Sequence, residues 1–251
     1  MLKKILFVDL DDTIFQSFEK CEKGVELKPT AFLKDGSPIS YMSPKQRSFL
    51  SFAGQGTTMI PTTARNLNAF RRVRLDWSSY VILNYGGVIL NPDGGADTAW
   101  LDRTRANATK ALPGLQHAVK LLDDYASRKG LSARARIIED FGVPFYVVIK
   151  DSEKIAARLE KMERDVLNTW VKTEGKDYYI HRNGNNLAVL PLTLNKANAV
   201  AYLSQKLKQE FAGIVTFGMG DSKSDARFMA ACDYAIVPQG SQLASMTLET
   251  L

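Results

Sequence analysis

Short apolar runs that end in polar residues recur along the first third of the chain. Residues 5–8, 57–61 and 81–83 are such runs and predict three strands. The first, which is short, apolar and β-prone, predicts a buried strand of a parallel sheet. Between the first two, Ser43 and Gln46 form a capping box around a proline, which predicts the start of a helix. Strands and helices that alternate in this way indicate an α/β fold.

The pattern changes in the middle of the chain, where strands and helices no longer alternate. A Pro-Asp-Gly-Gly turn follows the apolar run at 88–90, and Pro113 is expected to open an amphipathic helix. The other elements expected there are a strand at 145–149, a helix at 155–166, and two strands at 177–181 and 187–190 joined through Asn183 and Gly184. Together these elements predict an α+β module.

The α/β pattern resumes after Pro191. Asn195 is expected to cap a helix, and residues 214–217, 222–231 and 234–237 predict a strand, a helix and a strand in turn. The chain thus returns to the kind of structure with which it begins.

This return divides the chain into two predicted domains. We predict a Rossmann-like α/β core with a parallel sheet, made of residues 1–87 and 183–251, and an inserted α+β cap made of residues 88–182. A chain of 251 residues is long enough for two modest domains that bury their own cores without disulfides. Cys21 and Cys232 are expected to be reduced thiols of a cytoplasmic protein.

The charge balance narrows the choice of partners. Lys and Arg number 33 against 27 Asp and Glu, a net charge of +6, which suits nucleic acid, a membrane surface or a phosphorylated small molecule. The densest basic group, Arg65, Arg71, Arg72 and Arg74, falls in an expected amphipathic helix and predicts a solvated helix face. The chain has no basic stripe interleaved with aromatics and no run of about 18 apolar residues, so no nucleic acid and no membrane is expected as partner. The apolar run near Met1 is too short for a signal peptide, and we expect a monomer or a weak homodimer.

Two acidic clusters carry the candidate chemistry, and each follows an expected strand. In the first, Asp9, Asp11 and Asp12 follow the strand at 5–8, at the carboxyl edge where α/β proteins bind ligands. An extended backbone would point Asp9 and Asp11 the same way, and two carboxylates near 4 Å repel by about 4 kcal/mol at an effective dielectric near 20. A cation or a shared proton would relieve that repulsion, whereas the alternative is a solvated turn rich in aspartate.

The second cluster, Asp221 and Asp225, follows the strand at 214–217 and opens an expected helix. Residues four apart share one face of a helix, so both carboxylates are expected on the same side. Capping of that helix by Ser222 or Asp221 would explain the motif without any function. Taken together, the two clusters predict a hard-oxygen cation site, and the small number of protein ligands favours magnesium over calcium.

Three further segments suit an anion or a substrate. Thr62 and Thr63 end a strand before a helix start, where hydroxyl and backbone N–H groups attract anions. Lys196 lies in the first turn of a helix, against the helix dipole, which makes a functional role more plausible than for other single lysines; the alternative is a solvated surface lysine. The Asn-Tyr-Gly-Gly segment at 84–87, at the entry to the cap, is either a candidate substrate loop or a plain turn.

The order of these motifs resembles one known family. Asp9-x-Asp11-x-Thr13, Thr63-Ala64-Arg65, Asn195-Lys196 and Gly220-Asp221-Ser222-x-x-Asp225 are similar to the four motifs of the haloacid dehalogenase superfamily of phosphohydrolases. The long insertion between the second and third motifs resembles the branch with an α/β cap, which includes sucrose-phosphate phosphatases, mannosyl-phosphoglycerate phosphatases, Cof-like sugar phosphatases and phosphomannomutases. Asp12 and Ala64 stand where glycine is usual, and Lys223-Ser224 where Gly-Asn is common, which weakens any inference about the substrate.

The resemblance implies a role for each motif residue. Asp9 would be the nucleophile that forms an aspartyl-phosphate, and Asp11 the general acid and base, with a pKa raised by neighbouring carboxylates. Thr63 and Lys196 would bind the phosphoryl oxygens, and Lys196 would also restrain Asp9. The implied magnesium ligands are Asp9, the Asp11 backbone carbonyl, Asp221 and Ser222, with Asp225 as a ligand or as support for one. The implied substrate-binding residues are Thr13, Arg65, Asn84, Gly86, Gly87 and Asn195.

The resulting hypothesis is a magnesium-dependent phosphomonoester hydrolase that acts on a sugar phosphate or a similar small phosphorylated metabolite. One alternative is a sugar phosphomutase of the same fold, which the compact last motif disfavours. The other is a non-catalytic binding module, although decay should first remove the nucleophile or the metal carboxylates, and all are present. In the cap, His181, Arg182, Arg134 and Arg136 are candidates for contacting a sugar or a second anionic group, or are plain surface residues.

Overall fold

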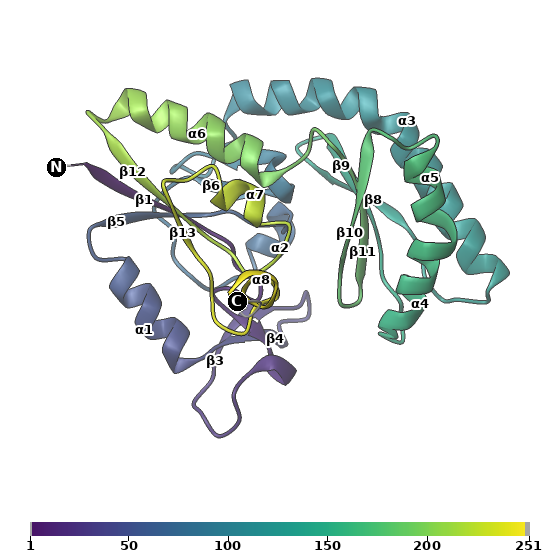
Figure 1. Ribbon diagram of the computed structural model, residues 1–251, viewed down its shortest axis with the longest axis horizontal. Coiled ribbons are helices and arrows are strands. Elements are labelled where there is room, and N and C mark those ends of the chain that lie inside the picture. The colour runs from purple at the N-terminus through teal and green to yellow at the C-terminus, as the bar shows by residue number, and fades with distance from the viewer. Residues whose placement is uncertain (1, 249–251) are drawn as a thin grey trace. The chain divides into compact units, whose positions relative to one another are not determined.

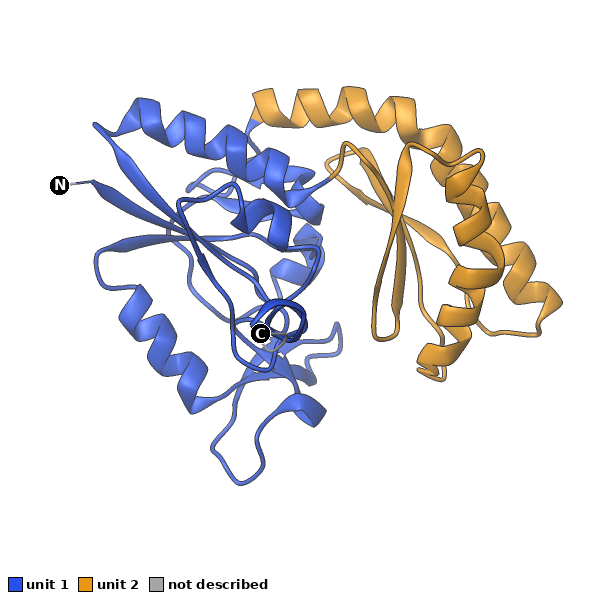
Figure 2. Ribbon diagram, viewed as in Figure 1, with its two compact units in different colours: residues 1–97, 195–251 blue, residues 98–194 orange. Residues whose placement is uncertain are grey.

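A computed structural model describes residues 2–248 of the chain and divides into two compact units (Figure 1; Figure 2). Unit 1 contains the residues up to Asp97 and those from Asn195 onward, and unit 2 is Thr98–Leu194. Among the described residues, no helix combines the length and the apolar character that crossing a membrane requires.

The core of unit 1 is a parallel sheet of four strands, and every one of them was expected. The strands lie in the order β13 (Tyr234–Ile236), β12 (Ile214–Met219), β1 (Lys3–Val8) and β5 (Thr57–Pro61). The central strand β1 is fully buried over its last four residues, as its continuous apolar run predicts. Figure 1 shows α6 (Lys196–Glu210) and α1 (Pro44–Ala53) flanking this sheet.

Both flanking helices begin where the sequence predicts. At α1 the Ser43 side chain accepts a hydrogen bond from the Gln46 N–H, and the Gln46 side chain accepts one from the Ser43 N–H at 2.9 Å. At α6 the Asn195 side chain accepts from the Asn198 N–H at 3.0 Å. These caps satisfy backbone donors that a helix start otherwise leaves without partners.

A second sheet of unit 1 was not expected from the sequence. It is antiparallel and has the order β2 (Gln16–Ser17), β4 (Pro38–Met42) and β3 (Lys28–Phe32), with a short 3-10 helix η1 (Phe18–Lys20) after β2. Two of these strands contain a proline, which removes a donor from the ladder and obscures the strand pattern in the sequence.

The expected amphipathic helix through Arg65 to Arg74 is reduced to one turn, α2 (Leu67–Phe70). Beyond that turn the chain pairs with β3: the Phe32 N–H donates to the Arg72 carbonyl at 3.1 Å, and the Arg74 N–H donates to the Thr30 carbonyl at 2.8 Å. The four arginines therefore do not form one solvated helix face, and the prediction was wrong because pairing with an unexpected strand ends the helix.

The first boundary between the units lies ten residues beyond the expected position, because β7 (Val88–Leu90) pairs antiparallel with β6 (Val81–Leu83) and so belongs to unit 1. The second lies twelve residues beyond it, because β11 (Asn186–Pro191) pairs within unit 2. The remaining elements of unit 1 are η2 (Asn84–Gly86), α7 (Ala226–Met229) and α8 (Gln242–Thr247).

Unit 2 is an antiparallel sheet with helices on one face, an α+β arrangement. The strands lie in the order β10 (Tyr178–Asn183), β11, β9 (Val143–Ile149) and β8 (Arg136–Asp140). The helices are α3 (Thr98–Arg128), α4 (Ala156–Met162), a π-helical segment η3 (Glu163–Leu167) and α5 (Asn168–Lys172). Leu122 and Trp170 of the helices pack in one buried cluster with Val147 and Val189 of the sheet, which forms the core of this unit.

Helix α3 begins fifteen residues before Pro113, where the sequence suggested a start. Proline in a helix interior removes a hydrogen bond and costs roughly 3 kcal/mol. The stretch before it nevertheless buries Trp100, Leu101, Ala108 and Ala111 along one face. Burial of that stripe outweighs the cost, so the proline lies inside the helix.

Gly114, the residue after Pro113, lets β10 approach α3 closely. A Cβ on Gly114 would overlap the phenol ring of Tyr178, whose hydroxyl donates to the Ala111 carbonyl at 2.6 Å. The bare backbone of Gly114 is therefore required for this contact.

Gly114→Ala is expected to lower the free energy of unfolding by about 1–3 kcal/mol through overpacking. Helix propensity alone predicts the opposite sign, a gain of up to about 1 kcal/mol. Urea unfolding followed by circular dichroism measures the difference. In a Tyr178→Ala background the same substitution should become neutral or stabilising, and stabilisation in the wild-type background would contradict the contact.

Candidate active site

The turn after β1 places the first acidic motif. The Asp9 N–H donates to the Met219 carbonyl at 2.9 Å, and the Leu10 carbonyl accepts from the N–H groups of the residues that follow, including Ile14 at 2.9 Å. Asp12 has a φ of 62°, in the left-handed region that favours glycine and that aspartate tolerates better than most residues. The backbone at this position thus accounts for Asp12 in place of the usual glycine, and its carboxylate pairs with Lys20 at 2.6 Å.

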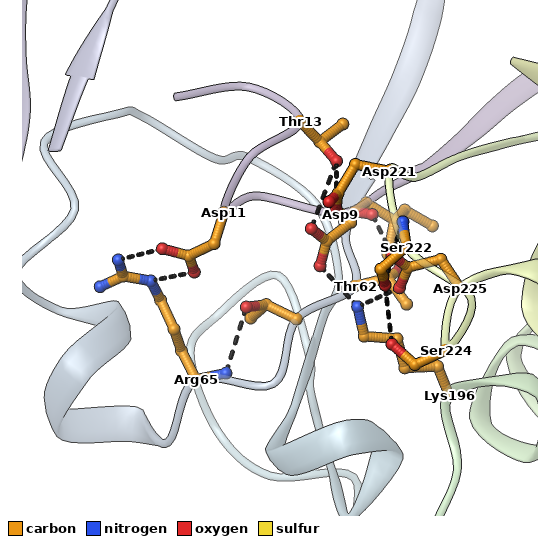
Figure 3. Close-up of polar contacts among 12 residues, drawn as sticks. Asp9, Asp11, Thr13, Thr62, Arg65, Lys196, Asp221, Ser222, Ser224 and Asp225 are labelled. Atoms are coloured by element: carbon orange, nitrogen blue, oxygen red, sulfur yellow. Dashed lines mark hydrogen bonds and ion pairs between the residues drawn. The ribbon is translucent and has the colours of Figure 1, made fainter. Parts of the chain in front are cut away.

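Lys196, at the start of α6, lies between two buried carboxylates (Figure 3). Its Nζ donates to Asp9 Oδ1 at 2.5 Å and to Asp225 Oδ1 at 2.7 Å. Burial alone would lower the pKa of Lys196, but Asp225 and Asp9 raise it above its ordinary value. The lysine is therefore a permanent cation that fixes the orientation of Asp9.

Three carboxylates share this one cation. Asp9, Asp221 and Asp225 each place an oxygen within 4.8 Å of the others, and the Thr13 hydroxyl lies 3.3 Å from Asp9 Oδ2 and 3.2 Å from Asp221 Oδ1. Two carboxylate charges 4.8 Å apart repel by about 3.5 kcal/mol at an effective dielectric near 20. When all three are ionised, Lys196 balances only one of them.

Burial, and then the neighbouring negative charges, raise the pKa values of two of these carboxylates. Burial, then Asp225 and Asp12, raise the pKa of Asp221 to about 7. Burial also raises the pKa of Asp9 well above its ordinary value, against the effect of Lys196. Oxygen donors that repel one another when ionised fit a small divalent cation, and Mg²⁺ accepts such a set.

Asp225 is the most firmly held of the three carboxylates. Besides Lys196, it accepts hydrogen bonds from the Ser222 N–H at 3.1 Å and the Ser222 hydroxyl at 2.6 Å. Burial would raise the pKa of Asp225, but Lys196 and these Ser222 bonds lower it. A Cβ on Gly220 would lie 2.5 Å from the Asp225 Cβ, so only glycine lets the two segments meet.

These bonds also correct the expected helix at 222–231. Ser222 does not cap a helix; it donates to Asp225, and α7 begins only at Ala226 with Asp225 at its N-cap position. Residues 222–225, which were expected to form the first helical turn, instead form a non-helical turn in which Ser222 donates to the Asp225 carboxylate.

Asp11 does not join the carboxylate cluster, contrary to the expectation that it points the same way as Asp9. Its carboxylate turns toward Arg65 and accepts two hydrogen bonds, from Nε at 2.7 Å and from Nη2 at 2.6 Å (Figure 3). A guanidinium, and not a neighbouring carboxylate, is therefore the charged group beside Asp11. No pattern in the sequence distinguished this pairing from a substrate-binding role for Arg65.

The other predicted residues contact the protein itself. The Thr63 hydroxyl is buried and accepts from the Arg65 N–H at 3.1 Å. Residues 84–87 are buried, and a Cβ on Gly86, whose φ is 96°, would lie 2.5 Å from the Asn195 carbonyl oxygen. Asn84, Gly86 and Gly87 thus form a buried turn against the start of the helix that carries Lys196, and Asn195 caps that helix.

The residues of unit 2 that were candidates for contacting a sugar or a second anionic group lie at or near the surface. Arg134 and Arg136 are exposed, His181 on β10 is half-buried, and Arg182 pairs with Glu163 at 2.7 Å.

Comparison with known proteins identifies the family. The sequence model of sucrose-6F-phosphate phosphohydrolase matches residues 57–246, about three quarters of the chain. The chain belongs to this family. It is a phosphatase, a hydrolase with the fold of the haloacid dehalogenase superfamily, as the motifs predict. Comparison with curated proteins finds no match.

Solved structures similar to this family member share its fold. Sucrose-phosphatase of Synechocystis sp. PCC6803, in complex with sucrose and phosphate, is 17% identical, with a TM-score of 0.51 over 100% of this chain and 97% of that one. The C-terminal domain of C. albicans trehalose-6-phosphate phosphatase is 14% identical, with a TM-score of 0.58 over 92% and 73%. IMP-bound IMP-nucleotidase of Plasmodium falciparum is 13% identical, with a TM-score of 0.57 over 99% and 68%.

The charge imbalance predicts how this phosphatase responds to magnesium. Millimolar Mg²⁺ should raise the thermal midpoint of the wild type, because a ligand that binds the folded state stabilises it. Asp221→Asn should abolish the shift, and in chelator at pH 8 this variant should be at least as stable as the wild type because one buried negative charge is gone.

Asp76→Asn, which changes an exposed aspartate of the same unit, should keep both the wild-type midpoint and the magnesium shift. Differential scanning fluorimetry measures all three proteins. An equal magnesium shift in Asp221→Asn would contradict the assignment of the cation site.

Proposed function

We propose that this phosphatase is a magnesium-dependent phosphomonoester hydrolase that removes phosphate from a sugar phosphate through an aspartyl-phosphate on Asp9. One observation carries the proposal: a buried carboxylate, held by Lys196 at 2.5 Å, faces two further carboxylates at the carboxyl end of a parallel sheet. An oriented carboxylate beside a cation site suits attack on phosphorus, since positioning and charge neutralisation supply most of the catalysis of phosphoryl transfer.

In the first step, an Asp9 oxygen forms a bond to phosphorus as the bond from phosphorus to the sugar oxygen breaks, and Asp11 gives a proton to that oxygen. In the second, water attacks phosphorus, Asp11 takes its proton, and the bond between Asp9 and phosphorus breaks to release phosphate. Splitting the displacement in this way makes each step easier.

The other residues bind and orient. Lys196 restrains Asp9, and Lys196 and the Thr63 hydroxyl would donate to phosphoryl oxygens. Asp9, the Asp11 carbonyl and Asp221 would hold magnesium, which when bound neutralises charge on the phosphoryl group. Asp225, engaged by Lys196 and Ser222, would support these ligands, and Ser222 would act through Asp225.

Unit 2 is the natural place for substrate selection, and we assign it the role of the cap. The matched family and two of the similar structures are, by name, phosphatases of sugar phosphates, whereas the third is a nucleotidase. A sugar phosphate is therefore the first substrate class to test, and a disaccharide phosphate the first member of it.

Phosphate release from a panel of phosphorylated metabolites tests this function. Wild type with Mg²⁺ should release phosphate from at least one sugar phosphate, and chelator should abolish the release. Asp9→Asn should lose at least about a thousandfold in kcat, because the nucleophile is gone. The control Asp76→Asn should keep wild-type rates.

Other outcomes separate the alternatives. Conversion of a sugar phosphate to an isomer without phosphate release would indicate a phosphomutase. No release by folded wild type from any compound, including an activated aryl phosphate, would favour a binding module. Equal release by wild type and Asp9→Asn would contradict the nucleophile assignment.

A further inference from the structure

Arg65 engages both oxygens of Asp11 with one planar group. The Nε–Oδ2 and Nη2–Oδ1 distances of 2.7 and 2.6 Å define a bidentate ion pair between residues 54 positions apart in the sequence. Such a fork fixes the carboxylate plane as well as its position, which a single ammonium group cannot do.

Arg65 is itself fixed along its whole length. Its side chain is only 13% exposed, its guanidinium lies 5.2 Å from the centre of the Phe15 ring, and Nη1 donates to the Ala69 carbonyl at 3.3 Å. Its backbone N–H donates to the Thr63 hydroxyl and its carbonyl accepts from the Asn84 N–H at 2.9 Å. The arginine is thus a rigid holder, whereas the Asp11 side chain, 44% exposed, is accessible to a substrate.

The same contacts argue against Arg65 as a binding group for the phosphate of the substrate. Three of its nitrogens already donate to the protein, two of them to a carboxylate that neutralises the guanidinium charge. An arginine that attracts a phosphate keeps its fork and its charge available.

We propose that Arg65 is a positioning residue that acts through Asp11, and that it holds the Asp11 carboxylate in the orientation from which it exchanges a proton with the leaving oxygen of the substrate. This proposal rests on the proposed function, in which Asp11 is the general acid. In the first step one Asp11 oxygen carries the proton that the sugar oxygen receives as its bond to phosphorus breaks. That proton occupies the second lone pair of the oxygen, which the hydrogen bond from Arg65 leaves available.

The leaving group of the substrate tests this role. A sugar oxygen needs a proton when it leaves, whereas the phenolate of p-nitrophenyl phosphate leaves without one. The ratio kcat/KM reports the first step only, so the later use of Asp11 as a base does not enter. Arg65→Ala should therefore lower kcat/KM for the best sugar phosphate by about 10–100-fold, part of the range for general acid catalysis, and for p-nitrophenyl phosphate by less than about threefold.

Three further variants make the test specific. Asp11→Asn should show the same dependence on the leaving group, and adding Arg65→Ala to it should cause no further loss, because both act through one proton transfer. Arg65→Lys keeps the charge but not the fork and should resemble Arg65→Ala. Arg71→Ala, at an exposed arginine six residues along, should leave both substrates unaffected.

The outcomes distinguish the two proposals. Equal losses on both substrates with a raised KM would assign Arg65 to substrate binding and overturn the inference, as would full activity of Arg65→Lys or Arg65→Ala. If the wild type itself releases no phosphate from either substrate, that result would overturn the proposed function instead. Circular dichroism and the magnesium-dependent thermal shift verify folding, and Arg65→Lys carries the test where Arg65→Ala does not fold.

Discussion

The buried ammonium group of Lys196 organises unit 1. It joins Asp9, 187 residues away at the end of β1, to Asp225, 29 residues away after β12, so it connects the segments before and after unit 2. Buried charges are stable only when they are paired, and losing one partner of such a pair typically costs 3–5 kcal/mol. The geometry of the carboxylates is thus a condition of folding. When all three are ionised, two negative charges remain uncompensated, which a divalent cation would neutralise.

Close backbone approach makes this arrangement possible. Gly86 lies against the carbonyl of Asn195, and Gly220 lies against the Asp225 side chain, each where a Cβ would come within 2.5 Å. The contact of Gly86 positions the helix that carries Lys196, and the contact of Gly220 positions the loop that carries Asp225. Gly86, which was expected to bind substrate, thus contacts the start of the lysine-bearing helix, and Gly220 contacts the carboxylate-bearing loop.

The sequence predicted the features that depend on local pattern. The parallel strands follow from continuous apolar runs, and the caps at Ser43 and Asn195 follow from side-chain chemistry that is local to a helix start. The features it did not predict depend on tertiary pairing. Helix α3 continues past Pro113 because it buries a stripe of side chains that includes Trp100. Helix α2 ends after Phe70 because the chain then pairs with β3. The bidentate pair of Arg65 and Asp11 joins two segments whose contact cannot be read from their spacing in the sequence.

The proposed mechanism depends most on Asp9 as the nucleophile, and chemical trapping tests this role directly. Enzyme turning over p-nitrophenyl phosphate with Mg²⁺ would be quenched in acid and reduced with borohydride, which converts an aspartyl-phosphate to homoserine. Peptide mass spectrometry should find homoserine at position 9, and more of it in Asp11→Asn, in which the attacking water lacks its base. Homoserine at another aspartate, or its absence from both proteins during measured turnover, would contradict the account.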